Sequence, residues 1–62
     1  MNTKELKTKL SNAEGFLQIE TKDSNLLEVI EGRFRFVLFV NGGVKKTSKT
    51  LAPIAKKLNE LI

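Results

Sequence analysis

The stretch RFRFVLFVNGGVKK, residues 33–46, decides the fold, because it holds a strongly apolar run and the clearest turn signal in the chain. Its enrichment in Phe and Val predicts a strand over residues 33–40. A continuous helix through residues 26–40 is the rival interpretation, and Gly32 argues against it. Side chains alternate across a strand, so every second residue shares one apolar face that a helix can cover. These residues are Phe34, Phe36, Leu38 and Val40.

The opposite face of this strand changes character along its length. It begins with Arg33 and Arg35, which suit water, and continues with Val37 and Phe39, which do not. We therefore expect Val37 and Phe39 to be covered, either by the first helix or by another molecule. A second copy of the chain is favoured as this cover, because the core of so short a chain is small.

Turn signals divide the region around this strand into a meander. Asn41-Gly42-Gly43 predicts a tight hairpin, because Asn and Gly accept the positive φ that such turns require. A short fourth strand should follow over residues 44–48, and its basic, polar composition suits a sheet edge. Upstream, Glu31-Gly32 predicts a two-residue loop after a strand over residues 26–30. The alternation in FLQIET predicts a further strand over residues 16–21.

A helix is expected at each end of the chain. The first covers residues 2–14, where Asn2 can cap the helix and Glu5 completes a capping box. The second follows Thr50, which should cap it, and carries Pro53 in its first turn, where the missing N–H has no helical partner to lose. Together with the strands, these helices predict an α+β fold, a three- to four-stranded antiparallel meander flanked by an N-terminal and a C-terminal helix, in the order α-β-β-β-(β)-α.

Length and composition narrow the possible classes of protein. A chain of 62 residues allows a single domain, residues 1–62. The absence of Cys makes the cytoplasm the default location, and no segment approaches the roughly 20 apolar residues of a membrane span, so no membrane partner is expected. His is also absent and the acids are scattered. We therefore expect no catalytic residues, no metal site, no cofactor and no enzymatic activity.

Charge is distributed unevenly along the chain. Residues 1–32 carry four lysines against six acids, a net charge of −2, whereas residues 33–62 carry seven cations against Glu60 alone, a net charge of +6. This asymmetry predicts a surface that holds phosphates without reading sequence, with an affinity that falls as salt rises. The alternative is that the lysines only keep a small protein soluble. The seven candidate nucleic-acid-binding residues are Arg33, Arg35, Lys45, Lys46, Lys49, Lys56 and Lys57.

Aromatic side chains give this prediction limited support. Proteins that bind single strands commonly stack bases on exposed aromatic rings, and this chain has four Phe but no Trp or Tyr. Phe34 and Phe36 are expected to face the core, which leaves Phe16 and Phe39 as the candidates for an exposed platform. Core packing is the simpler role for each of them.

The second half of the chain resembles a known family. From Glu31 onward the order is strand, Asn-Gly-Gly turn, Lys-Lys, and a Thr-Leu-Ala-Pro start to an amphipathic helix. This order resembles the transcriptional coactivators of the positive-cofactor-four type, which bind single-stranded DNA. The resemblance covers residues 31–62, because the leading helix is not part of that family's core. It implies a role in transcription, phosphate contacts from Lys45, Lys46 and Lys49, and a dimer interface with Leu58, Leu61 and Ile62.

A second resemblance draws on the same lysines. KKTSK, residues 45–49, is similar to the Lys-Lys-x-x-Lys phosphate clamp of double-stranded-RNA-binding domains, although Pro53 stands where that family has an unbroken helix.

Three hypotheses for function follow. The first is a small nucleic-acid-binding protein that takes single-stranded DNA or structured RNA. The second is an adaptor or inhibitor, such as a mobile-element protein that blocks a host protein, and the third is a structural subunit. A homodimer is expected, with an interface formed by Val37, Phe39, Leu58, Leu61 and Ile62.

Overall fold

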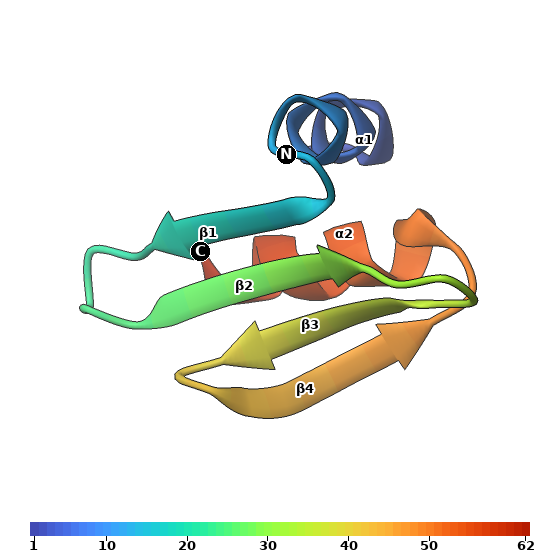
Figure 1. Ribbon diagram of the computed structural model, residues 1–62. Helices are drawn as coiled ribbons and strands as arrows, with labels where there is room; N and C mark the ends of the chain where they lie inside the picture. The colour runs from blue at the N-terminus through green and yellow to red at the C-terminus, as the bar shows by residue number, and fades with distance from the viewer.

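Four antiparallel strands form one open sheet in the computed structural model, which describes residues 1–62 (Figure 1). The strands follow one another in the order β1-β2-β3-β4, and a helix stands at each end of the chain. This arrangement confirms the α+β fold and includes the fourth strand. The elements are α1 (Thr3–Asn12), β1 (Phe16–Glu20), β2 (Leu26–Glu31), β3 (Phe36–Val40), β4 (Gly43–Ser48) and α2 (Leu51–Leu61).

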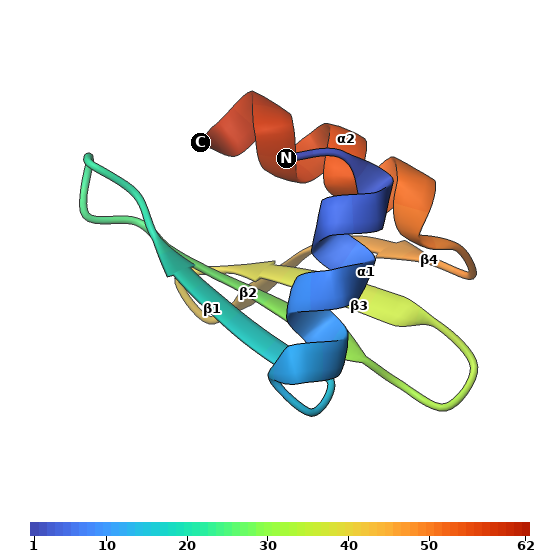
Figure 2. The same ribbon diagram turned by 90° about the horizontal axis from the view of Figure 1, so that it is seen from above.

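Both helices pack on the same face of the sheet. Figure 1 shows α2 behind the sheet and α1 above β1, and Figure 2 shows the two helices meeting where the N-terminus lies beside α2. Their apolar side chains form one core with alternate residues of β2 and β3. The nine buried residues are Leu6, Leu10, Leu27, Val29, Leu38, Leu51, Ile54, Ala55 and Leu58.

The capping box expected at the start of α1 is present. The Asn2 side chain accepts a hydrogen bond from the Glu5 backbone N–H at 2.7 Å, and the Glu5 carboxylate accepts one from the Asn2 N–H at 3.4 Å. Two otherwise unpaired backbone donors are thereby satisfied, which fixes the direction in which α1 leaves the chain terminus.

The start of α2 agrees with the sequence only in part. Pro53 is the third residue of the helix and lies in its first turn, as expected. Thr50 occupies the cap position, but its side chain makes no capping hydrogen bond, so the predicted role of its hydroxyl is wrong. Instead, the Thr50 N–H donates to the Ser48 hydroxyl at 3.2 Å, which holds the short connection between β4 and α2.

The hairpin between β3 and β4 confirms the Asn-Gly prediction. Asn41 and Gly42 have φ angles of 50° and 87°, and Val40 pairs with Gly43 across the turn. Positive φ at both central residues is typical of the tight turns that match the twist of antiparallel strands. Asn41 also reaches the start of β2, since its side chain accepts a hydrogen bond from the Leu26 N–H at 2.8 Å.

The connection between β2 and β3 differs from the expected two-residue loop. Glu31 pairs with Phe36, so residues 32–35 form a four-residue loop, which is closed by a hydrogen bond from the Gly32 N–H to the Arg35 carbonyl at 2.9 Å. The two-residue turn was a wrong prediction, because both of its common forms place positive φ on the first central residue, here Glu31, and residues such as Glu disfavour that conformation. As a result, Arg33 and Arg35 are not strand residues, and Phe34 is 79% exposed rather than part of the core.

The second face of the sheet has no cover. Residues opposite each other in an antiparallel register share a face, which places Val37 beside Ile30 and Phe39 beside Glu28, away from both helices. Of the two covers expected for Val37 and Phe39, the first helix is therefore wrong. We call this the outer face, and its strand residues are Phe16, Gln18, Glu20, Leu26, Glu28, Ile30, Val37, Phe39, Val44 and Thr47.

The position of Leu58 near the end of α2 shows that the expected dimer interface is wrong in part. Leu58 is fully buried in the core of a single chain and cannot contact a second copy. Leu61 is half-buried against the same core, whereas Ile62 is exposed.

Neither α1 nor α2 has the length and apolar character that a membrane-crossing helix needs.

Candidate nucleic-acid interface

Strand β4 and helix α2 bring four lysines together. Lys45 and Lys46 come from β4, and Lys56 and Lys57 lie on the side of α2 that its apolar stripe leaves free. All four line one open hollow of about 820 Å³, whose floor includes Pro53. Because the two elements are joined by a short connection and pack side by side, cations that are ten residues apart in sequence face the same space.

A bulge in β4 explains why two consecutive lysines line the same hollow. Leu38 pairs with Lys46 and Phe39 pairs with Val44, so Lys45 is an extra residue without a partner on β3. In a regular strand, neighbouring side chains point to opposite faces. A bulge bends the strand and re-aims its side chains. Lys45 and Lys46 can therefore act on the same ligand.

The loop between β2 and β3 extends this cationic region. Arg35 lines a second, smaller hollow of about 210 Å³ together with Thr47, Ser48 and Lys49. The two hollows share no lining residue, and consecutive residues of β4, Lys46 and Thr47, link them. We call the combined region the basic surface, and it consists of Arg35, Lys45, Lys46, Lys49, Lys56 and Lys57.

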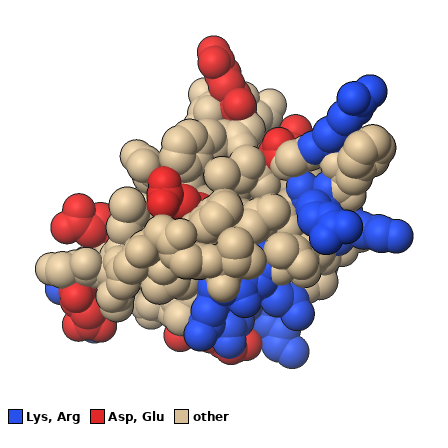
Figure 3. All heavy atoms as spheres, turned by 60° about the horizontal axis from the view of Figure 1, so that its bottom comes forward, with Lys and Arg blue, Asp and Glu red and all other residues tan.

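The charges of the basic surface are almost uncompensated. The only ion pair of the chain joins Lys57 Nζ to Glu60 Oε1 at 3.5 Å, and both side chains are partly exposed. Exposed pairs of this kind contribute well under about 1 kcal/mol, so Lys57 can exchange this partner for a phosphate. Figure 3 shows the Lys and Arg side chains gathered at the bottom and right of the view, whereas most acids lie to the left and top.

Two carboxylates on the mostly apolar outer face distinguish it from the basic surface. Glu28 lies in the middle of this face and accepts a hydrogen bond from the Gln18 side-chain amide at 3.2 Å, with Glu20 farther along β1. These carboxylates repel phosphates. No group of three acidic side chains lies close enough to hold a metal ion.

Six of the seven predicted cations come together in this structure, and Arg33 does not. Arg33 stands over the Phe34 ring in the loop, with its guanidinium carbon 5.6 Å from the ring centroid. Sequence reasoning missed the exposed Phe34, because it assigned residues 33–35 to the strand. The poor fit of Glu31 to a positive φ was the signal that could have revealed the longer loop.

Sequence reasoning also gave little weight to the lysines of α1. Lys4, Lys7 and Lys9 are exposed on this helix, and none of them lines either hollow of the basic surface. They provide a natural reference for experiments that remove positive charge.

Comparison of the chain with protein-family models, with curated proteins and with solved structures gives no match. The resemblances to the coactivators and to the double-stranded-RNA-binding domains therefore stay predictions.

Proposed function

We propose that this chain is a non-sequence-specific nucleic-acid-binding protein that holds the phosphate backbone on its basic surface. The observation that carries the proposal is the convergence of four lysines, from two elements, on one open hollow that contains a single acid, Glu60. Lysine ammonium groups bind phosphates as point charges. Contacts of this kind position a nucleic acid but do not distinguish its bases.

Two structural features favour binding over simple solubility. Lysines that only solubilise a protein, or that protect an edge strand from unwanted pairing, need no common ligand site. Here Lys56 and Lys57 on α2 face the same hollow as Lys45 and Lys46 on β4, despite the repulsion between like charges. The β4 bulge adds to this crowding when regular alternation would have relieved it.

A comparison of two triple variants tests the proposal. Lys45, Lys46 and Lys56 are changed to Gln in one variant, and Lys4, Lys7 and Lys9 of α1 are changed to Gln in the matched control. Each protein is titrated into a labelled single-stranded oligonucleotide at about 50 mM salt, and fluorescence anisotropy reports the affinity. Circular dichroism checks that both variants keep the wild-type fold.

The two variants lose the same charge but should differ in binding. Loss of three phosphate contacts, each releasing about 0.7 counterion from a single strand, predicts affinity roughly 10²- to 10³-fold lower at about 50 mM salt. The α1 control should lose less than about tenfold, because its lysines act only through the long-range field. Equal losses in the two variants would show that net charge, and not the basic surface, governs binding.

The outer face supports a second candidate function, the formation of a homodimer. A twofold axis parallel to the strands would set β1 of one copy against β4 of its partner. This placement would bring Glu20 near the outer-face residues of the partner's β4, Val44 and Thr47, which carry no negative charge. Val37 and Phe39 would then be covered by Ile30 and other apolar residues of the second copy.

The expected dimer is weak. Four strands spaced by about 4.8 Å, with five residues each at about 3.3 Å, give a footprint of only about 300 Å², compared with about 800 Å² per partner in a standard interface. Sedimentation should therefore show dimers only at high protein concentration, and a Phe39→Asp variant should stay monomeric. If the wild-type chain is monomeric at millimolar concentration, the dimer is rejected. The partner of this face would then be a different protein, as expected for an adaptor or inhibitor.

A further inference from the structure

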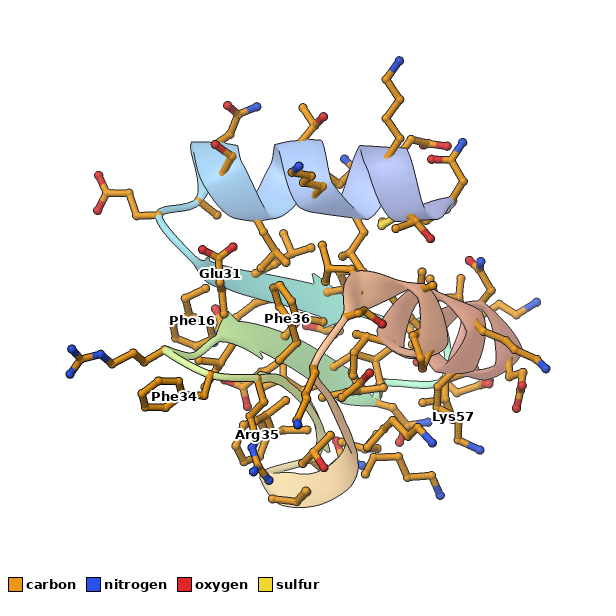
Figure 4. The ribbon with its side chains drawn as sticks, turned by 90° about the vertical axis from the view of Figure 1, so that its right-hand side faces the viewer. Phe16, Glu31, Phe34, Arg35, Phe36 and Lys57 are labelled. Carbon is orange, nitrogen blue, oxygen red and sulfur yellow. The ribbon has the colours of Figure 1, made fainter.

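The loop between β2 and β3 displays an aromatic ring that the fold does not use. Phe34 is 79% exposed, more than any other large hydrophobic residue of the chain. In Figure 4 it projects from the end of the sheet on the same side as the half-exposed Phe16, whereas Phe36 points toward the helices. Exposure of an entire Phe side chain forgoes the hydrophobic stabilisation that burial would give. A functional contact would explain why the ring stands there.

The loop holds this ring in a defined position. The Gly32 N–H donates to the Arg35 carbonyl at 2.9 Å, which closes the loop and leaves residues 33 and 34 at its tip. The backbone approaches so closely at Gly32 that a Cβ atom there would lie 2.8 Å from the Arg35 carbonyl oxygen. Only glycine fits this closure, so the exposure of Phe34 follows from a specific loop geometry.

Two arginines flank the ring, and neither is neutralised. The Arg33 guanidinium carbon lies 5.6 Å from the Phe34 ring centroid, within the range of a cation–π contact. Neither Arg33 nor Arg35 forms an ion pair, since Lys57 and Glu60 form the only one in the chain. The aromatic ring therefore comes with two guanidinium groups that are available to phosphates.

The same loop is continuous with the basic surface. Arg35 lines the second hollow together with Lys49, and Ser48 pairs with Phe36 at the end of β4 nearest the loop. A strand of nucleic acid held along β4 would thus reach the loop at one end of its path. The backbone contacts and the aromatic ring would then lie on a single track.

We infer that the Phe34 loop is a stacking site for an unpaired base, and that the protein prefers single-stranded to base-paired nucleic acid. A base stacks on the face of the Phe34 ring that Arg33 leaves open, and Arg33 and Arg35 hold the neighbouring phosphates. Duplex bases already stack inside the helix and reach the ring only after unstacking, which is energetically costly. This inference rests on the proposed function and adds the class of nucleic acid that the basic surface serves.

A Phe34→Trp variant tests base contact directly. The wild-type chain contains no Trp and no Tyr, so a single Trp at this position is a unique fluorescent reporter. Its exposed position lets the larger ring enter without disturbing the core. We expect its fluorescence to be quenched by an oligothymidine of about ten nucleotides, within the roughly 4 to 16 that small binding folds cover, and to change little with a duplex.

Two further variants separate stacking from simple apolar contact. Phe34→Ala should lower the affinity for single strands roughly 5- to 140-fold, and Phe34→Leu should lose nearly as much because it keeps apolar bulk without a π face. Both variants should bind duplex as the wild type does. Ile62→Ala, which trims a different exposed hydrophobic residue, is the matched control and should bind single strands normally.

Failure of the inference and failure of the proposed function give different results. Equal affinity of the wild type for single strands and duplex, or full single-strand affinity in Phe34→Ala, would overturn the inference and leave the basic surface in place. Full affinity in Phe34→Leu with loss in Phe34→Ala would also overturn stacking, because it would indicate a simple apolar contact with the nucleic acid. Absence of any binding at low salt would overturn the proposed function together with the inference.

Discussion

Asn41 links the β3–β4 turn to β2, and three substitutions at this position measure what the link contributes. Its side-chain oxygen accepts the Leu26 N–H at 2.8 Å, and its amide donates to the Asn25 side-chain oxygen at 3.0 Å. Its φ is 50°, in the region that Asn tolerates better than Ala. Asn41→Gly removes the side-chain hydrogen bonds and leaves a residue that accepts this φ freely, whereas Asn41→Ala removes the same bonds and leaves a residue that disfavours positive φ.

The expected losses follow from these geometries. Two partly exposed hydrogen bonds at about 0.5–1 kcal/mol each predict a loss of about 1–2 kcal/mol for Asn41→Gly. A positive φ adds about 1–2 kcal/mol for Asn41→Ala, which brings its total to about 2–4 kcal/mol. Asn41→Asp keeps the acceptor for Leu26, and the amide of Asn25 can turn to donate to it. This variant should therefore stay within about 0.5 kcal/mol of the wild type.

Urea denaturation followed by circular dichroism measures these differences. With a slope of about 1 kcal/mol per molar, the transition midpoint should fall by about 1–2 M for Asn41→Gly and by about 2–4 M for Asn41→Ala. If Asn41→Ala is as stable as Asn41→Gly, the claim that positive φ at this position disfavours Ala is refuted. Wild-type stability in Asn41→Gly would refute the link to β2.

Three further predictions address the sheet faces, the α1 cap and the loop. Leu38→Ala should lower the free energy of unfolding, measured by urea denaturation, by about 2–5 kcal/mol, because Leu38 is fully buried beneath the helices. Val37→Ala should lower it by less than about 1 kcal/mol, because Val37 lies on the uncovered face. Equal losses would contradict this assignment of faces. Asn2→Ala should lose about 1 kcal/mol and speed hydrogen exchange in the first turn of α1, and unchanged exchange would argue against the capping box. Gly32→Ala should open the Gly32–Arg35 closure, cost roughly 0.5–1.5 kcal/mol and increase amide exchange at residue 32, whereas an unchanged amide would contradict the close approach seen there.

Local chemistry explains the parts of the fold that the sequence predicted correctly. The Asn-Gly turn, the Asn2–Glu5 capping box and Pro53 in the first turn of α2 each depend on neighbouring residues and a single backbone requirement. The apolar alternation of β3 likewise identified which residues meet the helices. These signals act within a few positions of one another, so they can be interpreted without knowledge of tertiary structure.

The errors arose where tertiary context decides the outcome. Arginine and phenylalanine alternate at residues 33–36 as they would in a strand, but the register of β2 with β3 begins only at Glu31 and Phe36. No glycine at the bulge position marks the bulge in the sequence, because Lys45 lies within a run of Val and Lys. The candidate site depends on both features. Its residue types were therefore predictable, whereas their grouping around one hollow was not.

The basic surface also suggests why β4 is tolerated as an exposed edge. Lysines and a bulge are two of the devices that keep edge strands from pairing with other chains. That role accounts for Lys45 and Lys46 but not for Lys56 and Lys57, which lie on a helix. Ligand binding accounts for all four lysines. The two lysines on α2 therefore favour ligand binding over edge protection.

The salt dependence of oligonucleotide binding tests the central claim most directly. If four to six cations of the basic surface contact phosphates, the logarithm of the association constant should fall against the logarithm of salt concentration with a slope of roughly −3 to −4 for single strands. This slope corresponds to a loss of about 60- to 250-fold between 50 and 200 mM salt. A slope near zero, or no binding at the lowest salt concentration, would contradict the assignment of the basic surface to a phosphate backbone.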